Sequence, residues 1–441
     1  MKKTNSYLMS AFIVSLSLGS METASAAAVV QCPGDINNDA IVDVPVYKKD
    51  LNGNFIIDPV NGDPSNGFKV PRQVNCKHIS GGDGFATMAD GKVLYTLGFG
   101  ELTGIPQEQA IEHNITGAEL PAPKIIMDEG DEFYLTLTNV GMSMRPDLFD
   151  PHTVHFHGFP NAASIFDGVP DDSISINMLS SLTYYYNVVE PGTYLYHCHV
   201  EAAEHMQMGM IGNLYVRPRQ NKTGCANGSC PVAQLGGNPD LTAPKGYTYN
   251  DGDGATAYDV EMPIQITSLD PVFHDAHINV QPLRFADMKD SYPLINGRGY
   301  PDTVNPAVLA GPAENGNKNV QKETSVINAT VGQKILLRAS NVSITRFFTF
   351  STMGLKMKVV GLGAKLLRGP DPASGKLYDY HGADLSYDTS SVTLGGGESA
   401  DIIIDTTNVS PGKYFLYTTN LNYLSNDVED FGGIMTEINI N

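Results

Sequence analysis

Apolar side chains recur at every second position over much of the chain from about residue 120 onward. The alternation is clear at Phe133, Leu135 and Leu137, and it returns over residues 184–188. A period of two is typical of strands that bury one face and expose the other. Turn-forming residues separate these runs, so the pattern predicts short strands joined by tight loops.

Two pieces of this strand pattern occur twice. Residues 130–139 (GDEFYLTLTN) match residues 332–341 (GQKILLRASN), with Gly and Asn at the same separation. Residues 191–196 (PGTYLY) match residues 411–416 (PGKYFL). An internal repeat of this size predicts two related units, and short alternating strands favour β-sandwiches. We therefore expect an all-β fold with two Greek-key β-sandwiches.

Composition divides the chain into five segments. A stretch rich in Asp, Asn and Gly precedes the strands, and a second Gly- and Pro-rich stretch separates the two repeats. The expected segments are a signal peptide (1–26), an Asp/Asn/Gly-rich N-terminal extension (27–105), a first sandwich (106–218), a linker with a small disulfide loop (219–254) and a second sandwich (255–441).

The first residues have the pattern of an export signal. Lys2 and Lys3 precede an apolar run over 8–18, and Ala24-Ser25-Ala26 follows as a small-residue cleavage site. The apolar run is shorter than the ~20 residues that a membrane-spanning helix needs. We therefore expect an exported protein, periplasmic or extracellular, without a membrane anchor.

The charge of the chain excludes two classes of partner. It carries 48 acidic and 28 basic side chains, a formal net charge of -20. Phosphate backbones and anionic lipid surfaces repel such a protein, so we expect neither nucleic acid nor membranes as partners. The 44 Gly, 27 Pro and absence of Trp fit a strand-and-turn protein better than a helical bundle.

Five cysteines in an exported chain leave one thiol without a disulfide partner. Cys32 and Cys76 flank one N-terminal segment, and Cys225 and Cys230 close a small loop in the linker. We expect these two pairs to form disulfides. Cys198 is then the remaining thiol, and its free state requires a reason.

Two Asp/Asn stretches in the N-terminal extension repeat at a spacing of 15 residues. Oxygen side chains at alternate positions of a loop can converge on calcium. However, the position of the final bidentate Glu holds Val46 in one stretch and Asn61 in the other, and Asx-rich turns form without any ion. The candidate calcium ligands are Asp35, Asn37, Asp39 and Asp43 in the first stretch and Asp50, Asn52, Asn54 and Asp58 in the second.

Two His-x-His triplets mark the first sandwich: His155-Phe-His157 and His197-Cys198-His199. In an extended strand, residues two apart share a face and the residue between them takes the other. His197 and His199 therefore face one way and Cys198 faces the opposite way. One strand can in this way serve two metal centres.

A thiolate, two imidazoles and a weak axial thioether form the ligand set of a blue (type 1) copper site. Soft sulfur and borderline nitrogen suit copper because it cycles between two oxidation states. Such a role would also explain why one cysteine stays free. The expected ligands are His152, Cys198, His205 and Met210, with Met206 and Met208 as competing axial candidates.

These residues resemble the signature of the multicopper oxidases and their two-domain cupredoxin relatives. The signature is His-x-x-His-x-His-Gly followed by His-Cys-His, a His and a Met, and the resemblance covers roughly 105–441. It implies cupredoxin-type sandwiches and an oxidoreductase that takes electrons at type 1 copper and passes them to a copper cluster that reduces O2. It implies His197, Cys198 and His199 as the catalytic path, and His155, His157, His197 and His199 as type 2/3 copper ligands.

The chain departs from the family pattern in two places. The loop from Cys198 to His205 is longer than is usual in these oxidases. In the second sandwich, the positions that match the ligands hold Phe348, Ser351 and Met353, and Tyr417, Thr418 and Thr419, so half of the eight cluster imidazoles are missing. Three completions stay open: two first sandwiches pair in a homo-oligomer, four imidazoles hold one or two coppers within one chain, or only the type 1 copper is loaded.

Other functions also stay open at this level. They are a copper-binding electron-transfer protein without oxidase activity, a copper nitrite-reductase-like enzyme, and an extracellular structural or calcium-dependent assembly protein. The nitrite-reductase hypothesis is weakened because the second domain lacks the third His ligand and His155 replaces a catalytic Asp. For an oxidase, the donor is a phenol, Fe(II), Mn(II) or a redox protein, and the acidic surface favours cations.

The remaining histidines form no His-x-His pair. We expect His78, His113 and His381 to be hydrogen-bonded core or surface residues. His274 and His277 are three residues apart and could clip a metal on a helical turn, but nearby prolines make a ligand role the weaker interpretation.

Overall fold

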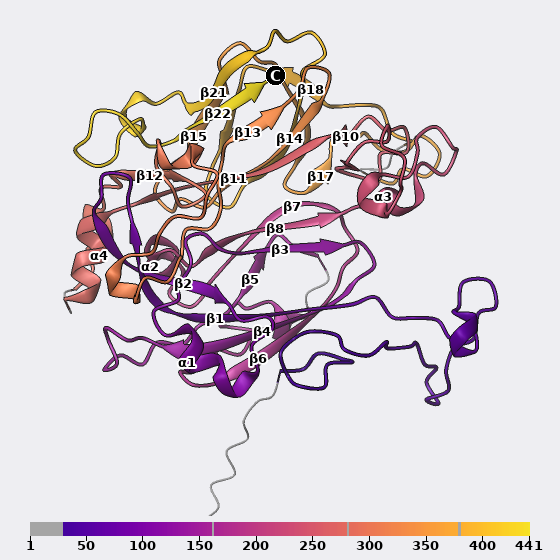
Figure 1. Cartoon of the computed structure of the whole chain (residues 1–441), viewed down its shortest axis with the longest axis horizontal. Coiled ribbons are helices and arrows are strands. Elements are labelled where there is room, and N and C mark those ends of the chain that lie inside the picture. Colours follow the sequence, from indigo (N-terminus) through magenta and orange to yellow (C-terminus); the bar gives the residue numbers. More distant parts are fainter. Residues whose placement is uncertain (1–29, 161–162, 280–281, 378–380) are drawn as a thin grey trace, which may run out of the picture.

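The computed structural model describes residues 30–160, 163–279, 282–377 and 381–441. The expected signal peptide (1–26) lies outside the described residues. Figure 1 shows two stacked β-sandwiches, the first in indigo to magenta and the second in orange to yellow. No helix in these ranges is both long enough and apolar enough to cross a bilayer.

The first sandwich consists of two four-stranded sheets. One sheet contains, in spatial order, β2 (Val93–Glu101), β1 (Val74–Thr87), β4 (Glu132–Gly141) and β6 (Ser181–Asn187). The other contains β3 (Ala122–Asp128), β8 (Ile211–Arg217), β7 (Gly192–His197) and β5 (His155–His157). Their facing side chains form one apolar core, which includes Phe133, Leu135 and Tyr196.

The second sandwich repeats this plan with additional strands. Its first sheet contains β12 (Tyr292–Ile295), β11 (Val260–Leu269), β14 (Lys334–Asn341), β20 (Ser399–Asp405), β16 (Met357–Leu362) and β17 (Lys365–Leu366), with β18 (Tyr387–Thr389) on β16. Its second sheet contains β13 (Ile327–Ala329), β22 (Met435–Ile440), β21 (Gly412–Thr418), β15 (Phe348–Thr352) and β19 (Ser391–Leu394).

Helices in the described ranges are short and lie in the connections. They are α1 (Ala110–Asn114), α2 (Ala202–Met208), α3 (Gln220–Thr223) and α4 (Pro271–Ile278). The 3-10 turns are η1 (Pro64–Asn66), η2 (Gln107–Gln109), η3 (Ser164–Phe166), η4 (Gln234–Gly236), η5 (Phe285–Asp287), η6 (Asp302–Val304), η7 (Ala313–Asn315) and η8 (Leu421–Tyr423).

Strand pairing supports the internal repeat. β1 is parallel to β4 and β4 antiparallel to β6, and β11, β14 and β20 pair in the same senses. In the facing sheets, His155 pairs with His197, and Ser351 pairs with Tyr417 at the equivalent place. The two sandwiches are therefore built alike, which confirms the expected all-β class of the fold.

Strands β1 and β2 lie inside the range expected to be an extension, so the first sandwich begins at Val74 and not at residue 106. Glycines interrupt the apolar alternation in these strands and hide them from a periodicity argument. The glycines allow close packing: a Cβ at Gly100 would lie 2.2 Å from Nδ2 of Asn114. Residues 30–73 form turns and isolated bridges, and part of this indigo segment extends away from the sandwiches (Figure 1).

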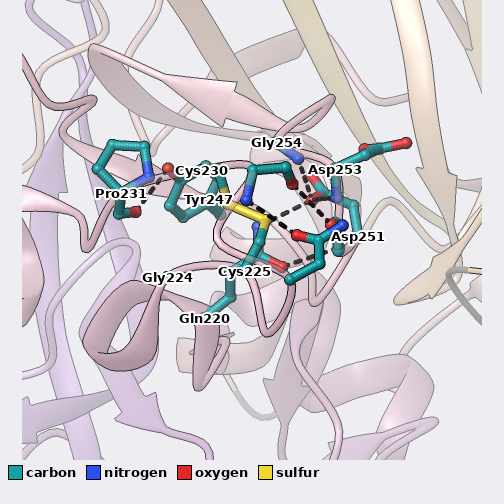
Figure 2. Close-up of a disulfide and its surroundings, with 12 residues drawn as sticks. Gln220, Gly224, Cys225, Cys230, Pro231, Tyr247, Asp251, Asp253 and Gly254 are labelled. Atoms are coloured by element: carbon teal, nitrogen blue, oxygen red, sulfur yellow. Dashed lines mark hydrogen bonds between the residues drawn. A yellow bond between two sulfur atoms is a disulfide. The ribbon is translucent and has the colours of Figure 1, made fainter.

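Both expected disulfides are present, and Cys198 is free and buried. Cys32–Cys76 ties the N-terminal segment to β1. Figure 2 shows Cys225–Cys230 in the linker, beside Asp251. The buried Asp251 carboxylate accepts hydrogen bonds from Gln220 Nε2 at 2.8 Å and from the Gly254 amide at 2.7 Å, so it orders the linker. The linker also contributes β9 (Gly246–Tyr247), which pairs with β10 (Ala257–Tyr258).

Candidate metal centres

The first candidate centre combines His152, Cys198 and His205. One ligand atom from each lies within 4.8 Å of the others, and all three side chains are buried. His152 precedes β5, Cys198 directly follows β7, and His205 lies in α2. The Nδ1 atom of His205 lies 3.2 Å from the Cys198 Sγ. The segment at His152 thus meets the distant stretch that holds both Cys198 and His205, which places a thiol beside two imidazoles.

The ring of His152 has the environment of a metal ligand. Both of its nitrogens are buried and neither has a hydrogen-bond partner. A buried polar atom without a partner costs about 1–3 kcal/mol, and a bound metal would remove that cost at one nitrogen. Sulfur with two imidazoles suits copper. The residues present therefore fit the expected metal.

The candidate axial methionines lie in different surroundings. Met210 is fully buried in the core of the first sandwich, and its carbonyl accepts a hydrogen bond from the Cys198 amide at 3.2 Å. Met208 is also fully buried there. Met206 instead lines a cavity beside the His-x-His triplets. This position makes Met206 the weakest of the three axial candidates.

A carboxylate orients His205 through the ring nitrogen that faces away from the sulfur. Asp150 Oδ1 lies 3.2 Å from Nε2 of His205, so the Nε2 proton is donated to it and Nδ1 is left toward the sulfur. The Thr153 amide donates to Cys198 Sγ at 3.5 Å. Sequence reasoning missed Asp150, although it stands two residues before His152 in the motif.

The buried charges around the sulfur favour the thiolate. Burial alone would raise the pKa of Cys198, but the charge of His205 and contacts with His205 and His152 outweigh burial and lower the pKa to about 5. Burial likewise opposes the charged form of His205, yet the Cys198 thiolate and Asp150 raise its pKa well above the ordinary value. A thiolate is the form that binds metals.

The second candidate centre is built on the paired strands β5 and β7. Ligand atoms of His155, His157 and His197 lie within 4.8 Å of one another. The ring centroid of His199 lies 5.1 Å from that of His155 and 5.6 Å from that of His197. The structure therefore brings all four histidines together, three of them in a tighter group.

Hydrogen bonds hold Nδ1 of His155 and Nδ1 of His197 on carbonyl oxygens, so that Nε2 of each ring faces this centre. Nδ1 of His155 donates to the Asp167 carbonyl and Nδ1 of His197 donates to the Cys198 carbonyl, both at 2.7 Å. Nε2 of His155 remains available as a ligand, and Nε2 of His197 lies 3.4 Å from Nδ1 of His157, so these two nitrogens face each other. Burial lowers the pKa of His197 to about 3 and lowers that of His157. Burial thus favours the neutral forms of His157 and His197, the form in which imidazole binds metals.

A cavity of about 500 Å³ separates this centre from the second sandwich. The four histidines form one wall, and residues 343–347 with Gly396 and Gly397 form the opposite wall. This opposite wall offers no His, Cys, Asp or Glu side chain. Ser351 and Tyr417 hold the positions equivalent to His155 and His197, as the strand register shows.

The other histidines in the described ranges belong to no group of three or more side chains that could hold a metal ion. Nε2 of His78 lies 2.8 Å from Thr138 Oγ1 inside the first sandwich. His274 and His277 lie on α4 and contact the first sandwich. His113 is exposed on α1 and His381 is exposed near β18.

The Asp/Asn stretches form turns that hold their own carboxylates. Asp35 accepts a hydrogen bond from the Asn37 amide at 3.0 Å, and Asp50 accepts one from the Asn52 amide at 2.9 Å. Asp58 accepts one from the Val60 amide at 2.9 Å. These are the Asx turns that form without an ion. The described part of the chain thus gives no support to calcium.

Comparisons with known proteins agree with this geometry. Two family models, both described as multicopper oxidase, match residues 104–221 and 276–437, together more than half of the chain. Laccase 1 of Metarhizium acridum is 33% identical over 123 residues, which are 27% of this chain and 19% of that protein. Laccase abr2 of Aspergillus fumigatus is 32% identical over 156 residues, 35% of this chain and 24% of that protein.

The fold has solved counterparts as well. The blue copper oxidase of Nitrosomonas europaea superposes with a TM-score of 0.57 at 20% identity, over 83% of this chain and 86% of that one. By contrast, the chain matches a quarter or less of the length of the two laccases.

Proposed function

The chain belongs to the multicopper oxidase family, and from this premise we propose that it is an exported oxidase that uses copper and O2. One observation carries the proposal. Cys198 faces the group with His152 and His205, while its chain neighbours His197 and His199 lie in the second group. Residues 197–199 thus join the candidate type 1 site at Cys198, which would accept electrons, to the histidine group beside the cavity.

Copper at the two centres would supply one-electron acceptance from a donor and delivery of those electrons to O2. The protein holds the thiolate in a fully buried position and orients His205 through Asp150. It orients the rings of His155 and His197 through carbonyl acceptors. The cavity beside these rings gives a small molecule such as O2 room to approach.

We favour one or two coppers at the four imidazoles of each chain over a cluster completed by a second copy. The support is the cavity itself, because the second sandwich of the same chain already occupies its far wall and provides no ligand there. Pairing of two first sandwiches face to face would have to displace that wall.

We propose a chemical class for the electron donor and not an individual molecule. The net charge of -20 concentrates cations near the protein, so we favour Fe(II), Mn(II) or a basic redox protein over a phenol. The two disulfides fit an oxidising compartment and so support export. Calcium has no part in the proposal, since the Asp/Asn carboxylates are held by their own turns.

Copper content and O2 uptake test the proposal together. We expect more than one copper per chain, blue absorption from thiolate-to-copper charge transfer, and O2 consumption with a reduced donor. Cys198→Ser should abolish the blue band and most of the oxidase activity, because the hydroxyl is a poor copper ligand. The control is Ser229→Ala, an exposed linker position, which should change neither.

Two outcomes would contradict this function. One copper per chain with a blue band and no O2 uptake would leave an electron carrier. A blue band that survives in Cys198→Ser would remove the thiolate from the site altogether.

A further inference from the structure

Helix α4 of the second sandwich reaches across to the loop that carries two of the expected type 1 ligands. This loop runs from His199 to Met210 and contains α2 and His205. α4 begins at Pro271, where the Asp270 side chain accepts hydrogen bonds from the first amides. The helix thus belongs to the ligand-free sandwich but contacts the metal-binding one.

The contacts are made by buried polar side chains. Nε2 of His277 lies 3.0 Å from Oε1 of Glu204, the residue directly before His205. His274 lies between two carbonyl oxygens of the first sandwich, with Nδ1 2.5 Å from that of Tyr95 and Nε2 2.9 Å from that of Gln207. Both α4 side chains are more than nine-tenths buried.

Two further hydrogen bonds connect the ligand loop region of the first sandwich with the second sandwich. Arg145 Nη1 donates to the His277 carbonyl at 3.0 Å, so the first sandwich holds the last turn of α4. Gln207 Nε2 donates to Asp290 of the second sandwich at 3.4 Å. The loop is therefore fixed at Glu204 and at Gln207, on either side of His205.

This arrangement has a specific consequence for the ligand loop. The loop is held in one geometry by contacts of Glu204 and Gln207 with the second sandwich. Groups that fix metal ligands from outside typically change metal affinity or activity 10–100-fold when removed. The contacts of α4 with Glu204 and Gln207 are of this kind, because they lie on either side of His205.

We propose that α4 positions the type 1 ligand loop, with His277 as the positioning residue, an inference that rests on the proposed copper function. The described residues of the second sandwich form no metal-binding cluster, yet this sandwich sets the geometry of the first sandwich's copper site. His277 acts through Glu204 on His205 and does not touch the metal.

The test compares three variants of the full chain. His277→Ala should weaken copper binding at the type 1 site about 10-fold, measured by competition with a copper chelator, and should alter the blue band and its paramagnetic spectrum. His277→Gln should restore both, because its amide nitrogen can reach Glu204. Asp275→Ala, on the exposed side of α4 and in only a 3.7 Å surface ion pair, should match the wild type.

A second variant guards against misfolding. Glu204→Ala removes the same contact from the first sandwich, and the double variant with His277→Ala should be no worse than either single one. A folded His277→Ala or Glu204→Ala protein with wild-type copper affinity and spectrum would overturn the inference. Absence of a blue band in the copper-loaded wild type would instead overturn the proposed function.

Discussion

The surroundings of individual side chains set His152, His155 and His197 apart from His274. His152 has two buried nitrogens without hydrogen-bond partners, and His155 and His197 each use one nitrogen on a carbonyl. His274, by contrast, has both nitrogens beside carbonyl oxygens. A neutral ring has one N–H and one lone pair, and carbonyl oxygens beside both nitrogens leave His274 poorly placed to bind a metal. His78 and His277 also keep one buried nitrogen without a partner, so the clustering of rings, and not hydrogen bonding alone, marks the ligand histidines.

His78 makes folding stability depend on pH. Burial lowers its pKa from 6.5 to about 4, so between these values the unfolded chain binds a proton that the folded chain does not. The contribution of His78 is intact above about pH 6.5 and is lost as the pH falls through 4, by about 3 kcal/mol in total. His78→Gln should flatten this part of the profile, measured by denaturant unfolding at pH 7 and 4.5.

The comparison uses the difference between the two pH values in each protein, because other groups titrate in the same range. Equal losses for wild type and His78→Gln would show that His78 already carries its proton in the folded chain.

At the scale of elements, the two sandwiches meet where β14 packs against β7 and β8. Arg338 on β14 is fully buried and lies 2.5 Å from Glu261. It also donates to Thr193 Oγ1 at 3.2 Å, and its guanidinium lies 4.5 Å from the ring centre of Tyr215. Thr193 and Tyr215 belong to the first sandwich, so one side chain joins both units.

Removal of this guanidinium should destabilise the protein strongly. Arg338→Ala leaves the buried carboxylate of Asp401 and the half-buried carboxylate of Glu261 without their partner, and loss of a buried ion-pair partner costs about 3–5 kcal/mol. Lys356→Ala removes an exposed pair with Asp388 and should cost below about 1 kcal/mol. Denaturant unfolding of both variants measures the difference, and equal costs would refute the bridging role.

The long spacing between Cys198 and His205 also has an explanation at this scale. The excursion between Cys198 and His205 contains the start of α2, and residues of α2 make contacts to α4. Spacing in the sequence indicates an excursion, but it shows neither the helix within it nor the contacts of that helix with the other sandwich.

At the scale of the whole molecule, docking of the sandwiches shapes the cavity at the four histidines. Gly397, in the turn before β20, contacts His157: a Cβ there would lie 2.8 Å from Nε2 of the ring. The residue also has φ +86°, which favours glycine. The second sandwich thus limits where His157 can lie.

Gly397→Ala should therefore displace His157 and reduce copper at the four imidazoles while the blue band stays. Gly363→Ala is the matched control, because Gly363 also has positive φ but no atom within 4 Å of the added Cβ. Copper per chain and absorption measure the outcome. Loss of the same copper in both variants would assign the effect to backbone strain and not to His157.

The sequence by itself determined the features that depend on neighbours along the chain. Strand alternation separates Cys198 from His197 and His199, and the repeat of 130–139 at 332–341 predicts the second sandwich. Cysteine parity identifies the free thiol, as the two disulfides confirm. Each of these follows from a local rule with a fixed period or count.

Only the tertiary structure decided what faces these residues. The contact of His277 with Glu204, the far wall of the cavity and the strands hidden by glycines in 74–101 all depend on how distant segments dock. Periodicity gives the face on which a side chain lies, but not the partner across an interface. Packing between the sandwiches selects that partner, because it buries polar groups that then require one another.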